Sequence, residues 1–285
     1  MNTQWLLAIV IAWSAAYILL SPVIAAPLYN SMLCYPNYPS RYDEKAYSIS
    51  QLDGIAKKDL RIEVPSGKTI HAWYFHNTHS DGLVLIHHGN AGNISNRIGL
   101  VDDLLKLGYS VLLYDYQGYG LSDGSPSIQN ICLDGTAAFD YATKQLGYPE
   151  NKIIQYGESL GCAVASQVST TRNCCALILE SPFSSLKIIA GEHLFILRAY
   201  PTALFPKPLL NNLAILQAPH PPLIIFHGEQ DLTIPVSHGK ELFEKAAQPK
   251  RLVLLPNSTH CVAEADHQLF MNSLNAFLAS LKNPS

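Results

Sequence analysis

The chain has 285 residues, a formal net charge of -3 and only 14% charged residues. That length is enough for one large α/β domain with a substantial core, and the low charge without a long basic run argues against a nucleic-acid-binding surface. The six cysteines are irregularly spaced, which predicts buried thiols and fits neither a disulfide framework nor a zinc site.

The N-terminal segment is apolar and uncharged. Residues 5–27 read WLLAIVIAWSAAYILLSPVIAAP, a length that suits a helix crossing about 30 Å of hydrocarbon. We therefore expect residues 1–40 to be a membrane anchor and linker, with Trp5 and Tyr29 near the two interfaces. The alternative is a cleaved signal peptide, because VIA before Ala26 resembles a cleavage site. A missing basic region and a long apolar run favour the anchor. Cys34 is expected to be an ordinary thiol and not a lipidation site.

After residue 41 the chain alternates between strand-like and helix-like stretches. Residues 59–64 and 69–76 predict an antiparallel hairpin. Short apolar runs typical of strands buried on both faces of a parallel sheet follow at residues 83–87, 110–114, 152–156, 176–179, 223–226 and 251–255. Amphipathic, helix-like segments occur at residues 94–107, 128–146, 236–247 and 263–281. The alternation predicts a mostly parallel, doubly wound α/β sheet of about eight strands.

One serine lies between two glycines at a predicted strand-to-helix turn. Residues 153–165 read IIQYGESLGCAVA, with Ser159 between Gly157 and Gly161. There are two interpretations. Either the glycines do no more than permit a sharp strand-to-helix turn, or the turn holds Ser159 out as a nucleophile. In the second case Ser159 would stand at the carboxyl end of the sheet, where open α/β folds bind ligands.

A base and an acid follow in the required order. PLIIFHGEQDLTIP is a buried strand and a loop carrying Asp231, and RLVLLPNSTHC is a buried strand and a loop carrying His260. Nucleophile, acid and histidine is the order of α/β-hydrolases along the chain. His260 is expected to take the serine proton, and Asp231 to orient the imidazole. Glu229 and Glu180 remain alternative acids.

An oxyanion needs two backbone donors. The N–H of Leu160, which follows the nucleophile, is one candidate. The other is the N–H of Asn90 in the loop HHGNAGN, where Gly89 lets the backbone approach closely. His87 and His88 are expected to brace this loop and not to bind a metal, since no metal-ligand spacing accompanies them.

These motifs resemble those of the α/β-hydrolase superfamily over residues 41–285. HHGNAGN, YDYQGYGLSDGSPS, GESLGCAVA, LESPFSSL, FHGEQDLTIP and NSTH occur in the family's order. With the apolar N-terminus, the combination is similar to the membrane-anchored serine hydrolases that include protein depalmitoylases and related bacterial esterases. The resemblance implies hydrolysis of esters or thioesters without a metal or organic cofactor. Gln117 and Cys162 depart from the arginine and glycine usual in those relatives.

The segment 183–217 is apolar and rich in proline, and lies where hydrolases insert a short cap. It is either a pair of core helices with loops or a lid that binds an acyl chain. In the second case we expect Phe195, Leu204 and Leu209 to line the acyl path, with medium or long chains preferred over acetyl.

Membrane-tethered esterase or thioesterase is the function that these features favour. A serine peptidase of the same fold and a non-catalytic binding protein are the alternatives. Basic residues follow the apolar segment and none precedes it, which favours a cytoplasmic catalytic domain. Glycosylation motifs at Asn93 and Asn257 lie where a glycan would block the site, which also argues against a glycosylating secretory route.

Overall fold

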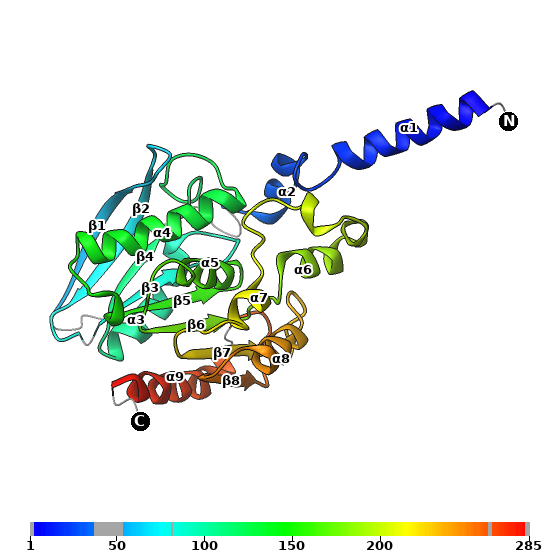
Figure 1. Cartoon of the computed structure of the whole chain (residues 1–285). Helices are drawn as coiled ribbons and strands as arrows, with labels where there is room; N and C mark the ends of the chain where they lie inside the picture. Colours follow the sequence, from blue (N-terminus) through cyan, green and yellow to red (C-terminus); the bar gives the residue numbers. More distant parts are fainter. Residues whose placement is uncertain (1–2, 37–53, 81, 262–263, 283–285) are drawn as a thin grey trace.

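The computed structural model describes residues 3–36, 54–80, 82–261 and 264–282. Within them, an eight-stranded sheet runs in the order β1-β2-β4-β3-β5-β6-β7-β8, with helices on both faces (Figure 1). The strands are β1 (Ile55–Glu63), β2 (Thr69–Asn77), β3 (Leu83–His87), β4 (Ser110–Tyr114), β5 (Ile153–Glu158), β6 (Ala176–Glu180), β7 (Leu223–Gly228) and β8 (Lys250–Leu255).

The sheet is antiparallel at one edge and parallel elsewhere. β1 pairs with β2, and β2 with β4, in antiparallel register. From β4 through β3, β5, β6, β7 and β8 every pairing is parallel. The predicted hairpin and the predicted doubly wound sheet are both confirmed, and the carboxyl ends of the parallel strands meet at one edge.

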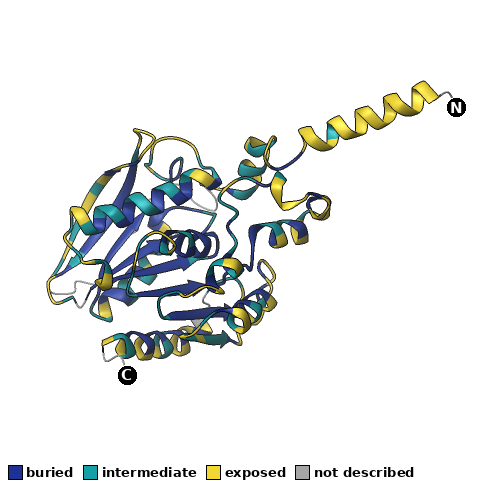
Figure 2. Cartoon of the chain, in the orientation of Figure 1, coloured by how far each residue is buried: buried dark blue, intermediate teal, exposed yellow. Residues whose placement is uncertain are grey.

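Two helical layers cover the sheet because successive strand residues point to opposite faces. In β3, Leu83 and Leu85 pack in one buried cluster with α4 (Ile128–Lys144) and α5 (Leu160–Ser169). Val84 and Ile86 pack in another with α3 (Ile98–Lys106) and α9 (His267–Lys282). Figure 2 shows the central strands buried between these layers, whereas most residues of the edge strands β1 and β8 are partly or fully exposed. The remaining helical elements of the domain are η1 (Ile94–Arg97), η2 (Glu150–Lys152), α6 (Leu186–His193), η3 (Phe195–Ala199), η4 (Thr202–Leu204), α7 (Asn212–Leu216), α8 (Val236–Lys245) and η5 (Glu264–Asp266).

The N-terminal helix is shorter than the sequence predicts. α1 (Thr3–Leu19) has 17 residues, a rise of about 26 Å, and α2 (Ala26–Leu33) follows after a break. The break occurs at Pro22, which lacks a backbone N–H and disfavours helical backbone at the residue before it. In the part of the chain that the structure describes, no helix has both the length and the apolar character needed to cross a membrane. In place of the single helix predicted over residues 5–27, the structure has two helices, α1 and α2.

The N-terminal segment contacts the region 183–217, which contains α6, η3, η4 and α7. Tyr17 stacks on Tyr200 with ring centroids 4.5 Å apart, and the backbone N–H of Val23 donates to the Leu204 carbonyl oxygen at 2.9 Å. α1 otherwise extends away from the domain (Figure 1) and is exposed along its length (Figure 2). The predicted boundary between residues 40 and 41 lies outside the described residues, as does the predicted start of the last helix at residue 263.

Candidate active site

Ser159 occupies the sharp turn between β5 and α5. Its backbone has φ 53° and ψ -113°, a strained combination for a residue with a side chain. The turn depends on its glycines: a Cβ at Gly161 would lie 1.8 Å from the His87 carbonyl oxygen, and one at Gly157 would lie 2.5 Å from the Cα of Cys162. The strand, turn and helix have the arrangement of a nucleophile elbow.

The structure brings Ser159, His260 and Asp231 together. His260 follows β8 and Asp231 follows β7, so both loops leave the same sheet edge as Ser159. His260 Nδ1 lies 2.8 Å from Asp231 Oδ2, and His260 Nε2 lies 3.0 Å from Ser159 Oγ. A carboxylate only accepts hydrogen bonds, so Nδ1 carries the proton and donates. Nε2 is then free to accept from the serine hydroxyl, as a general base must.

Asp231 is held as a carboxylate by its own loop. The backbone N–H groups of Thr233 and Ile234 both donate to Oδ1 at 2.8 Å, a local turn that aspartate often forms. Burial opposes ionisation of Asp231, but the hydrogen bonds from His260 and from Ile234 and Thr233 outweigh it, so the pKa lies below its ordinary value. His227, which sequence reasoning missed, lies buried with Nε2 3.6 Å from Asp231 Oδ2.

The alternative acids have other partners. Glu229 is exposed, and its ion-pair contact is with Lys240 at 3.9 Å. Glu180 is buried and accepts a hydrogen bond from the Tyr156 hydroxyl. Of the three carboxylates considered, all within the described part of the chain, Asp231 is the one that is hydrogen-bonded to His260.

The two candidate oxyanion donors lie next to Ser159. The N–H of Leu160 begins α5, where helix N–H groups have no acceptor within the helix. In the loop after β3, Nδ1 of His88 donates to the Gly89 carbonyl oxygen at 2.7 Å. The Gly89–Asn90 peptide is planar, so fixing its carbonyl directs the Asn90 N–H the opposite way. His88 therefore braces the loop, as the sequence predicts.

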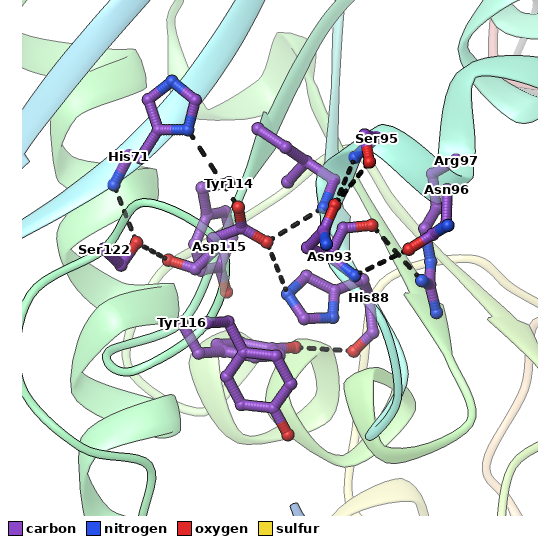
Figure 3. Close-up of polar contacts among 12 residues, drawn as sticks. His71, His88, Asn93, Ser95, Asn96, Arg97, Tyr114, Asp115, Tyr116 and Ser122 are labelled. Carbon is purple, nitrogen blue, oxygen red and sulfur yellow. Dashed lines mark hydrogen bonds and ion pairs between the residues drawn. The ribbon is translucent and has the colours of Figure 1, made fainter. Parts of the chain in front are cut away.

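His88 is itself fixed from behind (Figure 3). Its Nε2 faces the fully buried Asp115 carboxyl at 3.5 Å, and the Tyr116 hydroxyl donates to the His88 carbonyl oxygen at 2.9 Å. Burial, aided by the guanidinium of Arg97, lowers the pKa of His88 well below its ordinary value, so the ring is neutral at pH 7. A neutral ring with its proton on Nδ1 is the form that can donate to the Gly89 carbonyl.

An apolar cavity of about 430 Å³ opens at the serine. Ser159, Leu160 and Asn90 are among the residues that line it. The other walls come from α2, from α6 and the segment after it, and from the loop after β7, and include Tyr29, Met32, Leu33, Tyr35, Phe183, Leu186, Ile189, Leu194, Leu197, Phe205 and Ile234. The contribution of α2 was not predicted, since nothing in its sequence indicates where it packs.

The residues predicted to line the acyl path lie elsewhere. Phe195 is 75% exposed, and Leu204 and Leu209 pack against the small cluster of Leu197 and Phe205 within the region 183–217. Leu197 and Phe205, which are also in that region, do line the cavity. The three predicted side chains thus belong to the region 183–217, part of which lines the cavity, but they are not among the residues that line it.

Cys162 departs from the glycine that the family resemblance implies, and the structure accommodates it. Its thiol is completely buried and lies 3.1 Å from the carbonyl oxygens of Gly157 and Glu180. The sulfur therefore packs under the elbow and away from the cavity.

Comparisons with known proteins show which proteins the chain resembles. A family model described as serine aminopeptidase, S33, matches residues 78–216. An uncharacterized protein of Mycobacterium tuberculosis is 34% identical over 229 residues, which are 78% of this chain and 79% of that protein. The alpha/beta hydrolase domain-containing protein WAV2 of Arabidopsis thaliana is 30% identical over 235 residues, 72% of this chain and 76% of that protein.

A more distant relative and one solved structure extend the comparison. An uncharacterized membrane protein of Saccharomyces cerevisiae is 27% identical over 245 residues, 81% of this chain and 83% of that protein. The crystal structure of the Pyrococcus furiosus esterase Pf2001 superposes with a TM-score of 0.67 at 22% identity, and covers 87% of this chain and 97% of its own. From its fold and these relatives, the chain belongs to the α/β-hydrolase superfamily.

Proposed function

We propose that the protein is a serine hydrolase that cleaves carboxylic esters or thioesters with apolar acyl groups. Ser159 is the nucleophile, His260 the general base and Asp231 the acid that orients it. One observation carries the proposal. Ser159 is hydrogen-bonded to His260, which is hydrogen-bonded to Asp231, and Ser159, the first residue of this series, lines an apolar cavity. No step in this chemistry needs a metal or an organic cofactor.

The geometry fits formation of an acyl-enzyme. Ser159 Oγ attacks the substrate carbonyl carbon while its proton passes to His260 Nε2. The negative charge that develops on the carbonyl oxygen is stabilised by the N–H groups of Leu160 and Asn90. Collapse of the tetrahedral intermediate transfers the proton from His260 to the leaving alcohol or thiol. Water, activated by the same imidazole, then releases the carboxylic acid and restores Ser159.

The cavity supports a preference for longer acyl groups. Its walls are mostly apolar side chains, and each buried methylene contributes about 0.8 kcal/mol of binding. In this proposal residues 183–217 act as a cap that closes the acyl cavity. A series of p-nitrophenyl esters and acyl thioesters should show kcat/KM rising from two carbons towards eight. A maximum at acetyl would contradict the acyl preference while leaving the hydrolase proposal intact.

A peptidase is the second candidate, because the matching family model is described as a serine aminopeptidase. An aminopeptidase must hold the charged amino terminus of its substrate, and a desolvated ammonium needs an anionic partner. Among the described residues that line the cavity there is no aspartate or glutamate. We therefore expect hydrolysis of p-nitrophenyl esters and none of aminoacyl p-nitroanilides. The reverse result would favour the peptidase.

The proposal includes contact with lipid through α1. This helix carries no charged residue and is exposed along its length, and the yeast relative is described as a membrane protein. The full chain should cosediment with phosphatidylcholine vesicles, and Ile9→Lys with Trp13→Lys should reduce the bound fraction without changing ester turnover in solution. Equal binding of both proteins would contradict lipid contact by α1.

Labelling with a fluorophosphonate probe tests the central proposal. A base-activated serine attacks such phosphorus centres readily, so wild-type protein should be labelled on Ser159. Ser159→Ala and His260→Ala should each lower kcat by about 10³-fold or more, and the double variant should be no worse than either. His79→Ala, which changes an exposed histidine outside the site, is the control. Persistent labelling of Ser159→Ala would place the nucleophile elsewhere, and no labelling of wild type would favour a non-catalytic protein.

A further inference from the structure

The segment 33–35 lies directly against the candidate oxyanion loop, residues 88–92. The N–H of Tyr35 donates to the Asn90 carbonyl oxygen at 2.8 Å, and the N–H of Gly92 donates to the Tyr35 carbonyl oxygen at 3.1 Å. These bonds form a short parallel bridge between Tyr35 and Ala91. In addition, Nδ2 of Asn90 donates to the Leu33 carbonyl oxygen at 3.0 Å. Three hydrogen bonds thus tie the loop to a segment more than fifty residues earlier in the chain.

These contacts hold both carbonyl groups that flank the Asn90 backbone. His88 donates to the Gly89 oxygen, while Tyr35 and the Tyr119 hydroxyl both donate to the Asn90 oxygen, the latter at 2.8 Å. The N–H of Asn90 itself is not a donor in the backbone hydrogen bonds of the described chain. With its neighbours fixed on either side, that N–H is left available to the cavity.

This segment and the helix before it, α2, form one wall of the cavity. The wall includes Tyr29, Met32 and Leu33 of α2, and also Tyr35, two residues after the end of that helix. Cys34 anchors the segment, because it is only 5% exposed and packs in the main hydrophobic cluster. Tyr29 also packs against the cluster of Leu197, Tyr200 and Phe205, so α2 joins the cap to the oxyanion loop.

From these contacts we infer that residues 26–35 are a working part of the active site: residues 33–35 position the oxyanion donor Asn90, and α2 sets the acyl-chain length that the cavity accepts. This inference rests on the proposed hydrolase function. Tyr35 is a positioning residue, since it acts through Asn90. Met32 is a specificity residue, since it lines the cavity that would hold the acyl group.

Tyr35→Pro and Tyr35→Ala separate the role of the N–H from that of the side chain. Both variants lose the ring, but only proline also loses the N–H that donates to Asn90. Loss of one oxyanion donor costs about 10²–10³-fold in kcat, so loosening its support should lower kcat of Tyr35→Pro by about 10-fold relative to Tyr35→Ala. KM for p-nitrophenyl acetate should stay within about twofold, because the oxyanion forms only in the transition state. Binding of a trifluoromethyl ketone, which presents a tetrahedral oxyanion, should weaken in parallel with kcat.

Hydrogen exchange supplies a measurement that does not depend on activity. In the full-length chain, peptides covering residues 88–92 should exchange faster in Tyr35→Pro than in Tyr35→Ala, while peptides from β6 stay unchanged. If Tyr35→Pro does not fold, Asn90→Ala is used. It removes the side-chain hydrogen bond from Asn90 to the Leu33 carbonyl oxygen and keeps the backbone N–H. Equal exchange and equal kcat in the folded variant and its reference would overturn the positioning role.

Met32→Trp and Met32→Leu test the wall that α2 provides. Leucine conserves the volume, whereas tryptophan narrows the cavity. Met32→Trp should lower kcat/KM for an octanoyl ester by about 10-fold or more, which is in the range that pocket size alone can discriminate, and change that for acetyl less than twofold. A uniform change across chain lengths would overturn the specificity role. A wild-type protein that hydrolyses no ester, but whose loop exchange still responds to Tyr35→Pro, would refute the proposed function and leave the loop contact standing.

Discussion

Arg97 donates two hydrogen bonds to Glu158, the residue before Ser159. Nη2 of Arg97 lies 2.6 Å from Oε1 of Glu158, and Nε lies 3.1 Å from Oε2. Both side chains are largely buried, with 11% and 16% of their surface exposed. The pair links η1 to the nucleophile elbow behind the cavity.

Replacing both partners of this pair should cost less stability than the two single replacements added together. A buried charge without its partner costs about 3–5 kcal/mol, so Arg97→Met and Glu158→Gln should each lower the free energy of unfolding by about 3 kcal/mol. The double variant should lose clearly less than the sum of the two. Urea unfolding of the four proteins measures the coupling.

The bidentate pair of Arg172 and Asp140 is the matched reference. It has similar geometry, at 2.6 and 3.0 Å, but more exposed side chains, and such pairs contribute about 0–1 kcal/mol. If the losses of stability from Arg97→Met and Glu158→Gln simply add, or if both pairs show the same coupling free energy, burial does not govern the strength of the Arg97–Glu158 pair.

Asp231→Asn should lower kcat by about 10³–10⁴-fold while leaving the fold intact. The loop N–H groups of Thr233 and Ile234 select the oxygen of the new amide at the Oδ1 position. Its NH₂ group then faces His260 Nδ1, which must accept, and the ring proton moves to Nε2. Nε2 can no longer accept from Ser159. Steady-state kinetics and circular dichroism measure both outcomes, with Glu229→Gln as the exposed control. Retained turnover in Asp231→Asn would remove Asp231 from the series.

Stability should depend on pH through Asp134. Burial raises the pKa of this carboxyl to about 7, although the backbone N–H and side-chain amide of Gln117 both donate to it and oppose the rise. The folded state therefore keeps the proton to a higher pH than the unfolded chain, whose aspartates titrate near 4. Between these values the protein loses stability as pH rises, by up to about 1.4 kcal/mol per pH unit.

Asp134→Asn removes the titrating carboxyl and with it this contribution to the pH dependence of stability. The stability of the variant relative to wild type should improve from pH 4 to pH 7 and stay constant above it, as urea unfolding at several pH values can show. A difference that does not change with pH would mean that Asp134 is already ionised in the folded protein.

Gly161→Ala should abolish folding or activity, because the new Cβ would meet the His87 carbonyl oxygen at 1.8 Å and the backbone cannot yield cheaply. Gly99→Ala is the opposite case. A Cβ at Gly99 would meet nothing within 4 Å, and the residue is inside α3, where alanine is favoured by about 0.5–1 kcal/mol. The melting temperature of Gly99→Ala should rise. A tolerated Gly161→Ala would contradict the elbow geometry.

The candidate site could be located from the sequence because each of its side chains follows a buried strand. Ser159, Asp231 and His260 come after β5, β7 and β8, and parallel strands place their carboxyl ends at one edge. Hydrophobic runs and chain order were therefore enough. The hydrogen-bond distances among Ser159, His260 and Asp231 also depend on the shapes of the loops, such as the turn from Asp231 to Ile234. The hydrophobic periodicity of a sequence does not predict loop shape.

The cavity wall could not be predicted in the same way. Phe195, Leu204 and Leu209 were chosen for apolar character, but in an irregular segment composition does not tell which side faces a cavity. The packing of α2 depends on long-range contacts, such as that of Tyr35 with Asn90, for which the sequence contains no pattern. The break in the N-terminal helix had a local signal at Pro22, which the overall apolar character outweighed.

The order of the strands has a consequence during protein synthesis. Ser159 and His260, its proposed base, are 101 residues apart, and His260 follows β8, the edge strand that is made last among those described. At a synthesis rate of about 5–20 residues per second, the ribosome needs roughly 5 to 20 seconds to travel from one codon to the other. Throughout that interval the nascent polypeptide carries Ser159 without the imidazole that the proposed mechanism uses as its base. A chain still in synthesis would thus lack the proposed hydrolase activity until His260 has been made and β8 has joined the sheet.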